Sequence, residues 1–259
     1  MLIVNADDWG RDAVNTDRTL LCFERKRISS VSAMVFMQDS ERAAGIARDR
    51  AIDTGLHLNF TAPFTAPGVA LSLQRDLSHV CRFLLGSKFS PQLFNPLLRT
   101  AFARLVEAQM AEFERLYGNP PARIDGHHHM HLAANILRTG LLPVRCIVRR
   151  NFTFFADEKW WLNRFFRRMQ DFGLARRYKI ADAFFALPSP HRRDSMRRIV
   201  DLAADKNVEL EVHPGVEDEM QYLLSDHFAA LLHAVPLASG HLHASVAMRK
   251  GIQLHASSR

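Results

Sequence analysis

Histidine and aspartate side chains gather at four places in the chain. Asp7 and Asp8 directly follow an apolar run, His57 lies in a second such run, His213 follows a third, and residues 125–131 read Asp-Gly-His-His-His-Met-His. Carboxylate oxygens and imidazole nitrogens are ligands of Zn²⁺ and of other divalent metal ions. Two adjacent carboxylates repel each other, and in a metal site one can bind the ion while the other serves as a base.

The histidine-rich segment predicts a metal site if it forms a strand. On a strand, Asp125, His127, His129 and His131 share one face. Three imidazoles and one carboxylate would then converge on one ion. The segment is internal and lies among apolar residues, which argues against an expression tag. We expect a strand over residues 123–132, with an exposed polar loop as the alternative.

The other groups also have ordinary structural explanations. An isolated Asp-Asp pair most often belongs to a turn or a helix cap, and a lone strand histidine such as His57 is more often a hydrogen-bonded core residue than a ligand. The same holds for His213 at the end of a late strand. Their combination favours function, because all four groups fall at predicted carboxyl ends of strands, where α/β barrels place their chemistry.

The predicted elements that position these groups alternate between strands and helices. The expected strands cover residues 2–4, 31–37, 54–60, 123–132, 144–148, 180–187 and 208–212, and the expected helices cover 15–27, 40–50, 97–117 and 195–204. This alternation implies βα units, a parallel sheet and a barrel. We expect one domain over residues 1–259, with inserts near 63–96, a long loop with a short helix, and near 151–190.

The composition is that of a globular protein. The chain has 259 residues, of which 47% are hydrophobic and 24% charged. This hydrophobic fraction is enough to form a sizeable core and argues against global disorder. The chain contains no run of about 18 apolar residues and no signal-peptide pattern. Three widely spaced cysteines argue against a disulfide scaffold or a zinc-thiolate site. We therefore expect a cytoplasmic protein.

The net charge of +7 is concentrated in one part of the chain. Residues 145–198 carry 14 Lys and Arg against 5 Asp and Glu. As a helix, residues 159–169 would place Trp161, Phe165 and Met169 on one stripe beside arginines. Either these apolar side chains pack on the barrel, or the helix contacts an anionic membrane, at its inner face. Nucleic acid is not expected, because no nucleic-acid motif accompanies the segment.

Four short motifs occur in order along the chain. They are Asn-Ala-Asp-Asp-Trp-Gly at residues 5–10, Gly-Leu-His-Leu-Asn at 55–59, Asp-Gly-His-His-His-Met-His at 125–131 and His-Pro-Gly at 213–215. This set resembles the YdjC/ChbG-like carbohydrate deacetylase family, whose first motif usually has phenylalanine where this chain has Trp9. The resemblance covers nearly the whole chain and implies an α/β fold, a distorted (β/α) barrel like that of the polysaccharide deacetylases.

The resemblance also implies one divalent metal ion and the residues around it. Asp8, His57 and His127 correspond to the ligands, and Zn²⁺ or Mg²⁺ is the expected ion, with Mn²⁺ and Co²⁺ as further candidates. Asp7 corresponds to the catalytic base and His213 to the histidine that acts as an acid.

A second ligand pair is also consistent with the motifs. His127 and His131 form an i, i+4 pair that resembles the ligand pair of the polysaccharide deacetylases. We prefer His57 with His127, because the Gly-Leu-His-Leu-Asn motif otherwise has no explanation. Asp125, His129 and His131 would then support the ligands or face the substrate.

The resemblance implies an enzyme that removes an N-acetyl group from an amino sugar or glycoconjugate. This substrate would be linked to a lipid if the basic aromatic segment contacts a membrane. A bound metal would acidify water and polarise the amide carbonyl. Asp7 would accept the proton of water, and His213 would protonate the leaving amine. One alternative is a metal-dependent phosphoesterase, but the sequence has no Gly-rich phosphate loop. The other alternative is a catalytically silent membrane-surface module, but every expected site residue is present, which argues against it.

Overall fold

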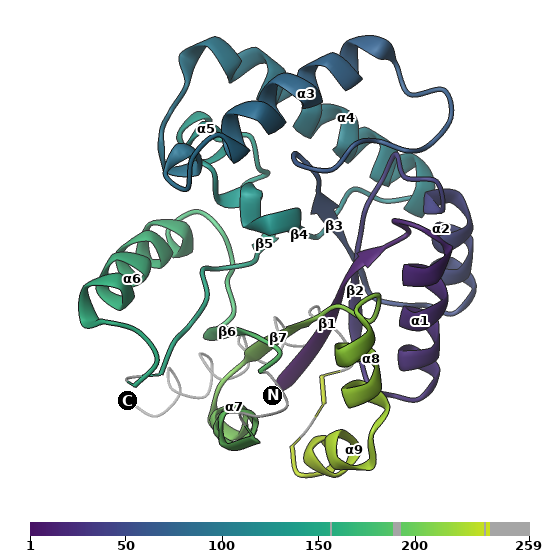
Figure 1. Ribbon diagram of the computed structural model, residues 1–259, viewed down its shortest axis with the longest axis vertical. Helices are drawn as coiled ribbons and strands as arrows, with labels where there is room; N and C mark the ends of the chain where they lie inside the picture. Colours follow the sequence, from purple (N-terminus) through teal and green to yellow (C-terminus); the bar gives the residue numbers. More distant parts are fainter. Residues whose placement is uncertain (156, 189–192, 236, 239–259) are drawn as a thin grey trace, which may run out of the picture.

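Parallel strands form the centre of the fold in the computed structural model, which describes residues 1–155, 157–188, 193–235 and 237–238 (Figure 1). The strands are β1 Leu2–Trp9, β2 Ser30–Ala33, β3 Thr54–Leu58, β4 Arg123–Gly126, β5 Ile147–Val148, β6 Ala183–Ala186 and β7 Val208–Val212. In the described residues they make one seven-stranded sheet in the order β5-β4-β3-β2-β1-β7-β6. Every pairing is parallel, as the strand and helix alternation predicts.

Helices surround the strands on the outside (Figure 1). They are α1 Ala13–Glu24, α2 Ser40–Asp49, α3 Leu71–Leu85, α4 Arg99–Tyr117, α5 Ala134–Thr139, α6 Trp161–Ala175, α7 Arg193–Asp205, α8 Glu217–Leu224 and α9 Asp226–His233, with short 3₁₀ turns η1 Ser90–Gln92, η2 Pro96–Leu98 and η3 His127–Leu132. In the part of the chain that the structure describes, no helix has the length and apolar character needed to cross a membrane.

The sheet curls into a half-barrel, so the expected distorted (β/α) barrel is confirmed. The central strands β1 and β7 are buried along their whole length, although β1 contains Asn5, Asp7 and Asp8 and β7 reads Val-Glu-Leu-Glu-Val. An isolated β-bridge connects the edge strand β5 to the segment that leads into β6. Lys179 forms an isolated parallel bridge with Ile147, and the backbone N–H of Val148 donates to the Lys179 carbonyl at 2.9 Å.

Several element boundaries agree with the sequence prediction, and others do not. The strand over 208–212 is confirmed, and the helix over 97–117 is confirmed as α4, which ends where Gly118 adopts a left-handed φ of 80°. The insert near 63–96 holds more helix than expected. In this insert the 15-residue α3 buries Leu77 and Leu84 in the core.

The predicted strand over residues 123–132 is wrong beyond Gly126. There β4 ends, and the next six residues form the 3₁₀ turn η3, in which His128 and His129 have positive φ values of 54° and 58°. The alternation of a strand therefore does not apply, and the four histidine side chains of this segment do not converge on one point. The rings of His127 and His128 stack with centroids 4.1 Å apart, whereas His129 and His131 have other partners.

Gly126 permits the close approach at which the chain turns. A Cβ atom there would lie 3.0 Å from the backbone nitrogen of His131 and 3.1 Å from the carbonyl oxygen of Leu58. Any larger residue would push η3 away from β3. The glycine thus lets η3 fold back against the neighbouring strand and sets the position of His127.

Candidate active site

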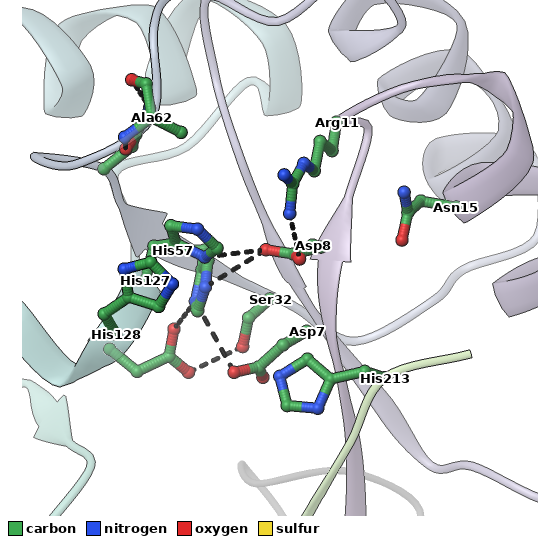
Figure 2. A network of polar contacts seen from close by, with 12 residues as sticks. Asp7, Asp8, Arg11, Asn15, Ser32, His57, Ala62, His127, His128 and His213 are labelled. Carbon is green, nitrogen blue, oxygen red and sulfur yellow. Dashed lines mark hydrogen bonds and ion pairs between the residues drawn. The ribbon is translucent and has the colours of Figure 1, made fainter. Parts of the chain in front are cut away.

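The five predicted site residues meet at the carboxyl-terminal edge of the sheet (Figure 2). Asp7 and Asp8 lie near the end of β1 and His57 lies in β3. His127 is the first residue after β4, and His213 is the first after β7. These strands are parallel and belong to the run β4-β3-β2-β1-β7 of one sheet, so the structure brings their carboxyl ends, and these side chains, together.

A β-bulge gives the two neighbouring aspartates different directions. The register between β1 and β2 shifts between Ala6 and Trp9, and Asp8 within this bulge has a φ of 65°. A non-glycine residue in this left-handed region costs on the order of 1–3 kcal/mol, a strain that clusters at functional sites. As a result, Asp8 faces the histidines of β3 and β4 while Asp7 turns toward the interior of the curl.

Asp8, His57 and His127 form a cluster whose donor atoms fit a divalent cation. Oδ1 of Asp8 lies 3.1 Å from Nδ1 of His127 and 3.5 Å from Nε2 of His57. All three ligand atoms lie within 4.8 Å of one another. This Oδ1 is buried and accepts no hydrogen bond of acceptable geometry from the described residues. A cation among these atoms would satisfy it, since one carboxylate and two imidazoles are a common zinc donor set.

Asp8 is ionised, as a metal ligand must be. Burial alone would raise its pKa, but the close contact with His127 and the charges of His57 and Arg11 outweigh burial and hold the pKa below its ordinary value. Arg11 also donates to Oδ2 of Asp8 at 2.8 Å. One carboxylate oxygen is therefore already bound, and the other is left for a cation.

Asp125 orients His57 from the side opposite Asp8. Nδ1 of His57 lies 2.7 Å from Oδ1 of Asp125 and donates to it, which turns Nε2 toward Asp8. Oδ2 of Asp125 accepts hydrogen bonds from Ser32 at 2.6 Å and from Arg123 at 3.0 Å. A carboxylate in this position fixes the tautomer and ring orientation of a metal-binding histidine.

Arg149, which the sequence analysis did not select, holds Asp7. Its Nη1 and Nη2 atoms donate to the two carboxylate oxygens of Asp7 at 2.6 and 2.7 Å, and its Nε donates to Glu209 at 2.7 Å. The guanidinium is buried. Burial would raise the pKa of Asp7, but the charge of Arg149 lowers it to about 2. The one sequence signal for Arg149 is that it directly follows a predicted strand, as the other site residues do.

Two further groups of potential ligands both include Asp7. Its carboxylate oxygens already accept hydrogen bonds from Arg149, whereas Oδ1 of Asp8 accepts none from the described residues. The cluster around Asp8 is therefore the better candidate for a metal site.

His213 lies between two glutamates. Its Nε2 is 3.3 Å from Oε1 of Glu211, its Nδ1 is 3.5 Å from Oε1 of Glu219, and its backbone N–H donates to Glu219 at 2.6 Å. Burial would lower the pKa of His213, but the two glutamates raise it to about 11. The imidazole is therefore protonated at neutral pH and can donate a proton.

His129 and His131 of η3 lie outside the cluster of Asp8, His57 and His127. His131 is buried, and its Nε2 donates to the carbonyl oxygen of Arg149 at 2.9 Å. His129 packs edge-on against Phe152, with ring centroids 4.5 Å apart. Burial lowers the pKa of His129 to about 3 and that of His131 to about 4, so both rings are neutral. The alternative ligand pair of His127 with His131 does not form in this structure.

A cavity of about 430 Å³ lies at the carboxyl end of β6, beside the polar cluster. Its apolar wall includes Phe152, Phe154, Phe155, Phe185, Leu187 and Ile199. The backbone N–H of Leu187 donates to the carbonyl oxygen of Glu211 at 2.9 Å, which places this wall next to the strand that leads to His213. Much of the wall comes from the insert near 151–190.

Known proteins are similar to this chain in sequence and in fold. A family model described as YdjC-like protein matches residues 1–234. The chain belongs to the YdjC-like protein family. Over 155 residues this YdjC-like protein is 30% identical to the chitooligosaccharide deacetylase of Yersinia pestis (strain Pestoides F), a match that covers 56% of this chain and 58% of that protein. Over 136 residues it is 29% identical to the carbohydrate deacetylase of Mus musculus, covering 52% and 44%. Both matches span less than two thirds of the relative's length.

A solved structure shares the fold of this YdjC-like protein. It comes from Enterococcus faecalis V583 and is named for cellobiose-phosphate cleavage. The two structures superpose with a TM-score of 0.64 over 95% of this chain and 98% of the other, at 16% sequence identity. At that identity the likeness concerns the fold alone.

Proposed function

We propose that this YdjC-like protein is a metal-dependent hydrolase that removes the N-acetyl group from an amino sugar or glycoconjugate. The observation that carries the proposal is the buried, unpartnered Oδ1 of Asp8 facing the imidazoles of His57 and His127, with Asp7 and His213 at the same edge of the sheet. The names of the Yersinia and mouse relatives support an acetylated carbohydrate as the substrate.

Asp8, His57 and His127 would hold the metal ion. This donor set accepts Zn²⁺ readily, and Mg²⁺, Mn²⁺ and Co²⁺ are the other candidates. When bound, the ion supplies Lewis-acid chemistry, acidifying water and polarising the amide carbonyl. Asp125 keeps His57 in the tautomer that leaves Nε2 free to ligate.

Asp7 would accept the proton of the attacking water. Its carboxylate is ionised across the physiological range, because Arg149 holds its pKa at about 2. The bidentate contact with Arg149 also fixes both oxygens in place.

His213 would protonate the leaving amine. An amide nitrogen is a poor leaving group until it is protonated, and the imidazolium of His213 is stabilised by Glu211 and Glu219. Water adds to the carbonyl carbon, the carbon–nitrogen bond breaks, and the products are acetate and a free amino sugar.

The proposal includes a sugar that carries an apolar group. The cavity at the carboxyl end of β6 has a largely aromatic and aliphatic wall, with Thr153, Glu158, Lys159 and Ser195 as its polar members. An acyl chain or another lipid group would be more stable in this cavity than in water. We propose a cytoplasmic location, in which a lipid-linked substrate would bring the enzyme to the inner face of the membrane.

The test is acetate release by the metal-loaded protein from N-acetylated monosaccharides, chito-oligosaccharides and lipid-linked N-acetyl sugars. The matched control is Asp7→Asn, which keeps the shape of the side chain and removes the base. We expect release by the wild-type protein and loss of release in the variant, with unchanged metal content. Stoichiometric metal binding with no acetate release from any of these classes, or phosphate release from phosphoesters instead, would contradict the proposal.

A further inference from the structure

The helix α6 turns its apolar side toward solvent. A helical period of 3.6 residues places Trp161, Phe165, Met169 and Phe172 along one face. Six large side chains of this helix and of the residue before it are 55–69% exposed, namely Trp160, Trp161, Phe165, Phe166, Met169 and Phe172. In Figure 1, α6 lies at the outside of the molecule, beyond the edge strands.

The side of α6 that faces the body is polar. Asp171 is buried and accepts hydrogen bonds from Nε and Nη2 of Arg150 at 3.0 and 2.6 Å. The guanidinium of Arg167 lies over the ring of Phe154, 5.2 Å from its centroid, and Leu174 is the buried apolar residue of the helix. A surface helix ordinarily directs its apolar stripe to the core. The expectation that these aromatic side chains pack on the barrel is therefore wrong.

Cationic side chains accompany the exposed apolar face. The segment 159–177 contains one Lys and five Arg against the single acid Asp171, which is buried and paired with Arg150. Lys159, Arg168 and Arg176 are exposed. This combination matches helices that lie in a membrane interface, whose apolar side enters the acyl boundary while the cations stay at the depth of the lipid phosphates.

We propose that α6 docks the protein on an anionic lipid bilayer. Charge complementarity favours lipid phosphates over a second copy of this chain, because two copies would bring two cationic faces together. The exposed side chains are large and apolar, which favours insertion among lipid acyl chains. A single-stranded nucleic acid instead binds along a cationic groove in which aromatic side chains stack on the bases. The proposal concerns a surface and does not depend on the deacetylase reaction.

The test is co-sedimentation of the full chain with large vesicles. One set contains phosphatidylcholine alone, and the other contains phosphatidylcholine mixed with phosphatidylglycerol. The test variant combines Trp161→Ser, Phe165→Ser and Phe172→Ser on α6. The control combines Leu93→Ser and Leu97→Ser, which removes exposed apolar side chains (59% and 91%) from a different surface. Circular dichroism of each variant establishes that it is folded.

We expect the wild-type protein to sediment with the phosphatidylglycerol vesicles, less so with neutral vesicles, and less as the salt concentration rises. The triple variant should bind at least about tenfold more weakly, because three large apolar side chains leave the interface. The control should bind as the wild type does. The salt series needs no variant, so it tests the proposal even if the triple variant fails to fold.

Other outcomes would overturn the proposal. These are absence of wild-type binding to anionic vesicles, equal binding to neutral vesicles, or binding that the triple substitution leaves unchanged. Retention of a DNA oligonucleotide in place of vesicles would assign the surface to nucleic acid. A wild-type dimer that the triple substitution dissociates, without any vesicle binding, would assign it to a second copy of the chain.

Discussion

A single guanidinium compensates several buried carboxylates at the candidate site. Arg149 lies within 4.0 Å of carboxylate oxygens of Asp7, Asp125, Glu209 and Glu211. Its partners belong to β1, β4 and β7, so one side chain connects strands across the interior of the curl. Removing one partner of a buried ion pair costs more free energy than the intact pair contributes to stability, because the other charge is left buried and unpaired.

Replacement of Arg149 should therefore be severe. We expect Arg149→Met to lower the free energy of unfolding by about 3–5 kcal/mol, because the buried carboxylates lose the guanidinium that they share. Chemical denaturation followed by circular dichroism measures this. Arg149→Lys is the control, since it keeps the charge and loses the bidentate contact with Asp7, and it should be less destabilising. Equal stability of Arg149→Met and the wild type would rule out this role.

The protonation of His213 makes a prediction about pH. Its pKa is raised from 6.5 to about 11, so the proton that it donates is present at neutral and moderately alkaline pH and is lost only as the pH rises through about 11. The kcat of the wild-type protein should therefore not fall between about pH 7 and 9 through this group. His213→Gln should lower kcat by about 10²–10⁴-fold at unchanged metal content.

The same shift makes a prediction about stability. A histidine with a raised folded pKa stabilises the native state below its unfolded pKa, and this contribution is lost as the pH rises toward the folded pKa. The difference in Tm between the wild type and His213→Gln should shrink as the pH rises above about 6.5. A difference that grows with pH would contradict the assignment of His213 as an imidazolium.

At the scale of elements, the strands that carry the site could be predicted from the sequence, but most of their ends and the local turns could not. The strand over 208–212 ends as predicted, before His213, whereas the strand expected over 2–4 continues to Trp9 and contains Asp7 and Asp8, and the strand expected over 54–60 ends at Leu58, after His57. The left-handed residues His128 and His129 have no such signal, because their conformation depends on the contact of η3 with β3. Periodicity also showed which residues of α6 share a face. Whether that face points to the core or to solvent depends on the ion pair between Asp171 and Arg150, which periodicity does not reveal.

Gly126 tests whether the turn after β4 positions His127. We expect Gly126→Ala to weaken metal binding by about 10–100-fold, because its Cβ would collide with backbone atoms and shift η3. The control is Gly45→Ala in α2, where a Cβ meets nothing within 4 Å. That variant should bind metal normally and be about 0.5–1 kcal/mol more stable, because alanine favours a helix interior. Titration calorimetry and denaturation measure the two effects, and equal metal affinity in both variants would contradict the prediction.

At the scale of the whole molecule, the proposed metal would join three strands of one sheet. Its ligands come from β1, β3 and the residue after β4, so an ion bound there is lost whenever the sheet opens. Ligands that bind the native state alone stabilise it, by about 2.7 kcal/mol at a free concentration 100 times the Kd.

Addition of Zn²⁺ should accordingly raise Tm, and a chelator should reverse the rise. Asp8→Asn should abolish most of the shift, because it replaces the charged ligand. Asp76→Asn is the control, since this carboxylate pairs with Arg104 away from the site. A shift in Tm that survives in Asp8→Asn would locate the ion elsewhere.

The position of β1 in the sheet has a consequence for how the protein is made. β1 is the first strand to be synthesised, but one of its two partners, β7, is the last strand within the described residues. Contacts between such distant segments form late and slow folding, because a long loop must close first. Asp7 and His213 belong to these two ends of the chain, so they come together only at that final step. A nascent chain still on the ribosome can therefore hold its early βα units folded and yet have no active site until β7 has emerged.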